Sequence, residues 1–98
     1  MIKAAILGAT GYTGEELIRL LSVHPQAEIQ MLVSHSTAGT PIDEIYGNFK
    51  HVCNLVCEEL DIDKVAKTCD VAFCALPHGA SKEVIPALYE KGIKVIDL

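Results

Sequence analysis

The chain has 98 residues, of which 50% are hydrophobic and 5% aromatic, and it carries a formal net charge of −5. This length allows one domain with a modest core, and the apolar content argues against a disordered tail. The negative charge excludes the broad cationic surface that nucleic-acid binding requires. We therefore expect one small domain over residues 1–98, built mostly from aliphatic side chains.

Strand and helix patterns alternate along the chain. In chain order we predict strand 2–7, a helix from Glu16 to Pro25, strand 27–33, strand 52–57, helix 62–67, strand 70–76, helix 79–90 and strand 93–98. No helix is predicted in the polar stretch 34–50. With right-handed crossovers, this alternation predicts an α/β, Rossmann-like open parallel sheet in the order 3-2-1-4-5.

The last predicted strand ends at Leu98, where sheets of this kind continue into loops that bear catalytic residues. We therefore expect the chain to be the N-terminal portion of a longer enzyme, truncated before the catalytic domain.

Three glycines stand at three-residue spacing between the first strand and the first helix, in the segment GATGYTGEEL from Gly8 to Leu17. Glycine permits backbone conformations closed to other residues, and the first amides of a helix offer donors to an anion. Thr10 occupies the place of the second glycine of G-x-G-x-x-G, which moves the closest backbone approach to Gly11. The turn predicts a dinucleotide pyrophosphate as ligand, with a purely structural turn as the alternative.

The loop after strand 27–33 bears on which dinucleotide is bound. A carboxylate about twenty positions past the turn would hydrogen-bond the ribose of NAD. Here the residues are Ser34, His35, Ser36 and Thr37, and no carboxylate appears before Asp43. The absence of a carboxylate favours NADP over NAD; no arginine or lysine is present either, but hydroxyls, amides and an imidazole that charges near neutrality can hold the 2′-phosphate. An ordinary polar loop is the alternative.

A third segment, ALPHGAS at residues 75–81, follows strand 70–76 at the switch point of the predicted sheet, where ligands bind. Pro77 stiffens it, Gly79 permits close approach, and Ser81 can cap the next helix. His78 has no orienting carboxylate or adjoining nucleophile near it in sequence. A cofactor contact or a structural role is therefore favoured over catalysis for His78.

The four cysteines, Cys53, Cys57, Cys69 and Cys74, lack the C-x2-C spacing of structural zinc sites. We interpret them as packed small hydrophobes rather than as metal ligands or a redox pair, and predict no metal site. Neither a signal peptide nor an apolar run long enough to span a bilayer is present. A reducing, cytoplasmic setting is expected.

Together, GATGYTGEEL, SHSTAGTPI, ALPHGAS and the closing KVIDL resemble the N-acetyl-gamma-glutamyl-phosphate reductase family over the whole chain. The resemblance implies NADPH-dependent reduction of N-acetylglutamyl 5-phosphate to N-acetylglutamate 5-semialdehyde in arginine biosynthesis, by a parent enzyme that is a homo-oligomer. The family's catalytic cysteine and histidine match nothing here, so no catalytic residue is assigned and the fragment is expected to be inactive. A family helix from the far C-terminus covers the sheet, so one face is expected to be partly bare.

The carry-over by resemblance is limited to cofactor contacts. The residues that match the family's pyrophosphate turn are Gly8, Thr10, Gly11, Tyr12, Thr13 and Gly14. Ser34 and Ser36 match its 2′-phosphate loop. Leu76, Pro77 and His78 match its loop near the nicotinamide ribose. The sequence departs from the family at His35, where arginine often stands.

Other functions share the same glycine turn. Another semialdehyde dehydrogenase, an epimerase or a short-chain reductase would use it, although the last two need a Tyr-x-x-x-Lys pair and we expect none in this chain. A stand-alone nucleotide-sensing module, the alternative outside enzymes, would carry a DNA-binding element, for which no basic helix is present.

Overall fold

The computed structural model describes the backbone of residues 1–98 and every side chain except that of His78. The elements in chain order are β1 (Ile2–Leu7), α1 (Tyr12–Ser22), β2 (Ala27–Val33), α2 (Ile42–Ile45), the 3-10 turn η1 (Gly47–Phe49), β3 (Cys57–Glu58), α3 (Ile62–Thr68), β4 (Val71–Cys74), α4 (His78–Glu90) and β5 (Lys94–Asp97). No helix of the described part is long and apolar enough to cross a lipid bilayer.

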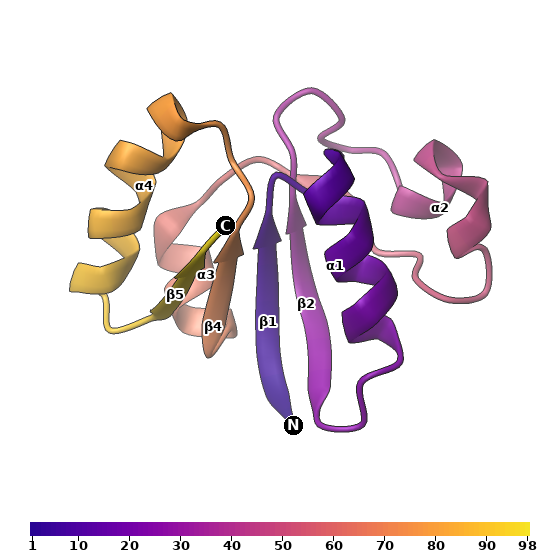
Figure 1. The fold of residues 1–98 in the computed structure, drawn as a ribbon, viewed down its shortest axis with the longest axis horizontal. Helices are drawn as coiled ribbons and strands as arrows, with labels where there is room; N and C mark the ends of the chain where they lie inside the picture. Colours follow the sequence, from indigo (N-terminus) through magenta and orange to yellow (C-terminus); the bar gives the residue numbers. More distant parts are fainter.

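The five strands form one parallel sheet in the order β3-β2-β1-β4-β5, which confirms the predicted fold and strand order (Figure 1). At the centre, Ile6 of β1 lies opposite Leu32 of β2 and Phe73 of β4. Because all strands point the same way, their carboxyl ends meet at one edge, and the loops that follow β1, β2 and β4 gather there.

Helices cover both faces of the sheet and divide the core into two clusters. In Figure 1, α1 lies in front of the sheet beside β2, whereas α3 lies behind the sheet. The buried residues on the α1 side are Ile6, Ala9, Ile18, Leu32, Ile42, Phe49 and Cys57. Those on the α3 and α4 side include Ala5, Leu7, Met31, Val33, Val65, Ala72 and Leu88. The helical spacing of apolar residues in the sequence corresponds to these buried stripes.

The third strand is shorter than predicted, because only Cys57–Glu58 pairs with β2. The residues before it pair instead with the preceding loop: Ile42 N–H donates to the Leu55 carbonyl and Cys57 N–H to the Thr40 carbonyl, both at 2.9 Å. The same loop contains the single helical turn α2, which was not predicted. Of the predicted strand 52–57, Cys53, Leu55 and Cys57 pack in the cluster on the α1 side, whereas Val52 and Val56 are exposed.

The predicted cap of the last helix is wrong. Helix α4 begins at His78, with Pro77 in extended conformation as its N-cap and no side-chain cap. The amides of Ala80 and Ser81 donate to the Pro77 carbonyl, at 3.0 and 3.1 Å. β4 ends earlier than predicted, at Cys74, and α4 begins one residue earlier than predicted, so Ser81 lies buried inside its first turn.

One part of the sheet has no helix over it among the described elements. On the α1 side of β4 and β5, a shallow cavity of about 540 Å³ is lined by Leu21, Phe73 and Ile96. The side chain of Ile96 is 43% exposed, and that of Ile2, which also lines the cavity, is 53% exposed. The sheet therefore leaves an apolar face partly bare, on the side opposite α3 and α4.

Candidate functional site

A cavity of about 820 Å³ opens at the carboxyl ends of the strands. Its walls come from the β1–α1 turn, the loop after β2, residues 59 and 60 after β3, and the β4–α4 loop. This is the switch point of an open parallel sheet, where the chain leaves β1 and β4 in opposite directions. The topology thus brings together three of the segments that the sequence singled out.

Gly8 closes the end of β1 in a conformation that only glycine adopts easily, with φ of +86°. Its N–H donates to the Val33 carbonyl at 2.9 Å, which ties the turn to the end of β2. A Cβ on Gly8 would lie 2.7 Å from the Ala75 carbonyl oxygen, on the side of β4. The turn is therefore held between the two neighbouring strands by backbone atoms.

The other two glycines of the turn differ in their surroundings. A Cβ on Gly14, inside the first turn of α1, would lie 2.2 Å from the Gly8 carbonyl oxygen and 2.8 Å from Ala9. A Cβ on Gly11, the N-cap of α1, would approach only the Gly8 oxygen, at 3.9 Å. Gly14 thus permits the helix to pack on the turn, whereas Gly11 leaves space beside the cavity.

The N-terminus of α1 supplies the donors of this end of the site. The first amides of a helix have no partner within it, and together with the helix dipole they attract an anion. Tyr12 and Thr13 contribute amides to this first turn, while their side chains are exposed and lie outside the cavity walls. The arrangement is suited to a pyrophosphate held by main-chain N–H groups.

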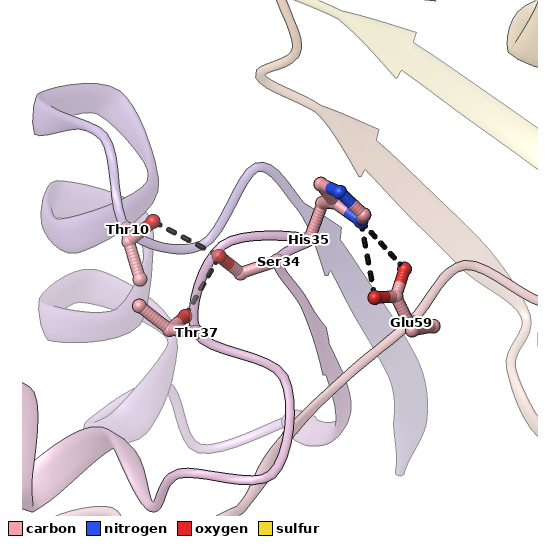
Figure 2. Close-up of polar contacts among 5 residues, drawn as sticks. All are labelled: Thr10, Ser34, His35, Thr37 and Glu59. Carbon is pink, nitrogen blue, oxygen red and sulfur yellow. Dashed lines mark hydrogen bonds and ion pairs between the residues drawn. The ribbon is translucent and has the colours of Figure 1, made fainter.

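Hydroxyl groups connect the glycine turn to the loop after β2 (Figure 2). The Ser34 hydroxyl lies 3.1 Å from that of Thr10 and accepts a hydrogen bond from the Thr37 hydroxyl at 2.7 Å. Ser34 is 6% exposed, so its side chain faces the protein. Its amide also donates to the Glu58 carbonyl at 3.1 Å. Of the two serines predicted to hold the 2′-phosphate, Ser34 thus stabilises the loop, and Ser36 is the exposed one.

Tyr46, the residue that follows α2, supports the glycine turn between β1 and α1. The sequence did not indicate this contact. Its hydroxyl donates to the Thr10 carbonyl at 2.5 Å, across 36 residues of sequence. Burial and the nearby Glu15 carboxylate raise the pKa of the Tyr46 phenol. Its ring packs edge-on against Phe49, with centroids 6.0 Å apart.

Tyr46 also corrects the expectation that the chain holds no Tyr-x-x-x-Lys pair, because Tyr46 and Lys50 have this spacing. Catalysis by such a pair needs a phenol whose pKa is lowered. Here burial raises the pKa and the hydroxyl is engaged with the Thr10 carbonyl. Tyr46 is therefore a structural donor.

The far end of the cavity, beyond Ser34, is lined by the exposed side chains of His35, Ser36 and Glu59. His35 Nδ1 lies 3.0 Å from both carboxylate oxygens of Glu59, as Figure 2 shows. This hydrogen bond and the negative charge of Glu59 raise the pKa of the His35 imidazole. Sequence reasoning missed Glu59; its position just after the third strand was the available signal.

The β4–α4 loop forms the remaining wall. Leu76 and Pro77, two of the predicted residues, line the cavity opposite the β2 loop. The prediction for the His78 side chain falls outside the described part of the structure. The geometry therefore brings the backbone turn, the β2 loop and the β4 loop to one cavity, as the sequence predicted.

Three of the four thiols lie in the core. Cys57, Cys69 and Cys74 are at most 6% exposed, and burial raises the pKa of each, that of Cys69 to about 11. A thiol in this state is protonated near neutral pH and is a poor nucleophile. These three side chains pack as small hydrophobes, as interpreted from the sequence.

The fold and the cavity together define an α/β nucleotide-binding domain of the Rossmann type. Residues 3–98 match the family model described as "Semialdehyde dehydrogenase, NAD binding domain". The chain belongs to this family.

Curated relatives resemble the chain along its whole length. It is 53% identical over 97 residues to N-acetyl-gamma-glutamyl-phosphate reductase from Acetivibrio thermocellus, covering 99% of this chain and 28% of that protein. It is 49% identical over 98 residues to the protein of the same name from Methanocella arvoryzae, covering 100% and 29%. The chain therefore spans less than a third of the length of these relatives.

Solved structures share the fold. Aspartate semialdehyde dehydrogenase from Candida albicans, determined with NADP, superposes with a TM-score of 0.87 at 29% identity, over 99% of this chain and 29% of that one. A probable aspartate-semialdehyde dehydrogenase from Pseudomonas aeruginosa superposes with a TM-score of 0.75 at 25% identity, over 99% and 28%. The cavity thus belongs to a fold that these dehydrogenases use.

Proposed function

We propose that the chain is the NADP-binding domain of an N-acetyl-gamma-glutamyl-phosphate reductase. The observation that carries the proposal is the single cavity in which the Gly8–Gly14 turn, the β2 loop and the β4 loop meet. Identities of 44% to 53% with proteins of that name support the choice among semialdehyde dehydrogenases.

The pyrophosphate would be held at the N-terminus of α1. The space beside Gly11 supports this, because Gly11 lines the cavity and a Cβ there would meet no atom nearer than the Gly8 oxygen, at 3.9 Å. The amides of Tyr12 and Thr13 would donate to the phosphate oxygens, whereas the Gly11 amide donates to the Gly8 carbonyl at 3.4 Å. Gly8 and Gly14 would act indirectly, since they let strand, turn and helix approach closely.

The 2′-phosphate of NADP would lie at the β2 loop. No carboxylate follows β2 directly, and the exposed Ser36 and His35 line this end of the cavity. Ser34 would fix the loop through Thr10 and Thr37. Leu76, Pro77 and the residue that follows them, His78, would lie towards the nicotinamide half.

Bound NADPH would supply the hydride that reduces the substrate's acyl group. This chain's part is to bind and orient the cofactor, since its buried thiols are poorly suited to attack an acyl phosphate. The substrate site and the catalytic groups would come from the rest of a full-length, homo-oligomeric reductase. Free cysteines support a reducing, cytoplasmic setting.

Titration with NADPH and with NADH, followed by calorimetry, tests the proposal. We expect saturable binding of both at one site, with NADPH bound more tightly. Failure of both to saturate would overturn the proposed function, and equal affinities would remove the assignment of the 2′-phosphate to the β2 loop.

A further inference from the structure

The β2 end of the cavity contains a carboxylate that the NADP assignment does not use. Glu59 follows β3, which is the edge strand beside β2, and its side chain lines the cavity together with His35 and Ser36. Carboxylates near an adenosine ribose favour the unphosphorylated dinucleotide. In this fold such a group comes from β3 rather than from β2.

We propose that Glu59 and His35 act together as a charge-adjustable selectivity pair, which determines how strongly the site prefers a 2′-phosphorylated dinucleotide over an unphosphorylated one. The inference rests on the proposed function. It assigns a specificity role to Glu59 and makes that role dependent on the protonation of His35.

The geometry places the two groups in direct contact. His35 Nδ1 lies 3.0 Å from Oε1 and Oε2 of Glu59, so the imidazole faces the carboxylate with one nitrogen and keeps the other for a second partner (Figure 2). The side chains are 92% and 62% exposed. Exposed pairs of this kind are weak, so an arriving phosphate can compete with the carboxylate for the imidazole.

Other charged groups near the pair are engaged elsewhere. The neighbouring Glu58 accepts a hydrogen bond from Lys64 Nζ at 2.5 Å, and the Asp61 carboxylate accepts from the Lys64 amide at 3.1 Å. Among the described side chains, His35 and Glu59 are the only ionisable groups that line the cavity. The charge at this end of the site is therefore set by these two residues.

The sign of the pH dependence follows from the charge states. The Glu59 carboxylate raises the pKa of His35, so the imidazole stays protonated to a higher pH than usual. Below that pKa the pair is neutral overall and offers an imidazolium to the phosphate. Above it the pair carries one negative charge, which repels a 2′-phosphate of charge about −2. Preference for NADPH over NADH should therefore fall as pH rises.

The test measures dissociation constants of NADPH and NADH between pH 6.5 and 9, above the second pKa of the phosphate at about 6. For the unmodified chain, the ratio of the NADH to the NADPH constant should fall about two- to fivefold across this range, the scale of an exposed charge interaction. Glu59→Gln should raise the ratio at pH 8.5 by a similar factor through tighter NADPH binding, with NADH little changed. His35→Gln should lower the ratio at pH 6.5 and flatten its pH dependence.

Glu58→Gln is the matched control, because it removes an adjacent carboxylate that lines no part of the cavity; the ratio should stay unchanged. NMR titration of the His35 ring gives an independent measure, and Glu59→Gln should lower its pKa. If both dinucleotides bind but Glu59→Gln leaves the ratio unchanged at every pH, the selectivity pair is refuted while the proposed function stands. If neither dinucleotide binds, the selectivity pair and the proposed function are both refuted.

Discussion

The two ends of the cavity are built in different ways. At the α1 end, the surface is mostly main chain: Gly8 is fixed between β2 and β4, and Gly14 lies buried under the turn. At the β2 end, the surface consists of exposed side chains, among them His35 and Glu59. The first end belongs to the core of the fold, whereas the second can change without disturbing it. Affinity for any dinucleotide should therefore depend on the first, and choice between dinucleotides on the second.

The largest effect should come from Gly14→Ala. Its Cβ would lie 2.2 Å from a backbone oxygen, which cannot move aside as a flexible side chain can. Overpacking of this kind costs about 3 kcal/mol or more, a large part of the stability of a small domain. Chemical denaturation should show this loss or an unfolded chain. A variant as stable as the parent would show that the turn is not held as rigidly as described.

Gly11→Ala is the counterpart that separates binding from folding. The added Cβ meets only the Gly8 oxygen at 3.9 Å, and the backbone φ of −86° suits alanine. Unfolding free energy should change by less than about 1 kcal/mol. Both NADPH and NADH should bind about tenfold more weakly, because the methyl group occupies the space for the pyrophosphate. Calorimetric titration checks this; a loss confined to NADPH would contradict the division between the two ends.

Tyr46→Phe should have the smallest effect of the three. It removes the donor to the Thr10 carbonyl but keeps the ring against Phe49. A lost hydrogen bond of this kind costs about 1 kcal/mol, and the cost should appear in the denaturation midpoint. Both dinucleotides should weaken equally and only slightly. The matched control is Tyr12→Phe, whose side chain is 95% exposed and should leave stability unchanged.

The local pattern of apolar residues and glycines was sufficient to predict the strands of the fold and their order. The bounds of β1 and β2, residues 2–7 and 27–33, agree with the prediction because these mostly apolar segments are bounded by Gly8 and by Pro25. The glycine spacing predicted the turn, and alternation predicted the strand order. Short-range signals were less informative at residues 52–57, where some of the apolar residues pack beside α1 and pair with residues 40–42.

The polar contacts of the site depend on distant parts of the chain. Tyr46 lies 36 residues from Thr10, and Glu59 lies 24 residues from His35. No periodicity or motif links such positions; they meet because β3 and α2 return to the side of the β2 loop. Burial likewise makes Ser34 a residue that stabilises the loop, because its hydroxyl faces Thr10 and Thr37. Sequence therefore predicted which segments form the cavity, and the structure supplied how their side chains are used.

The hydroxyl contacts from Thr10 through Ser34 to Thr37 have a consequence for the thermodynamics of association. They order the β2 loop through the protein's own hydroxyl groups. A ligand that enters need not freeze that loop, so the conformational entropy lost on binding comes mainly from the ligand itself and from the exposed side chains at the rim. The domain is thus preorganised, and the heat released on binding should report new contacts rather than refolding of the receptor.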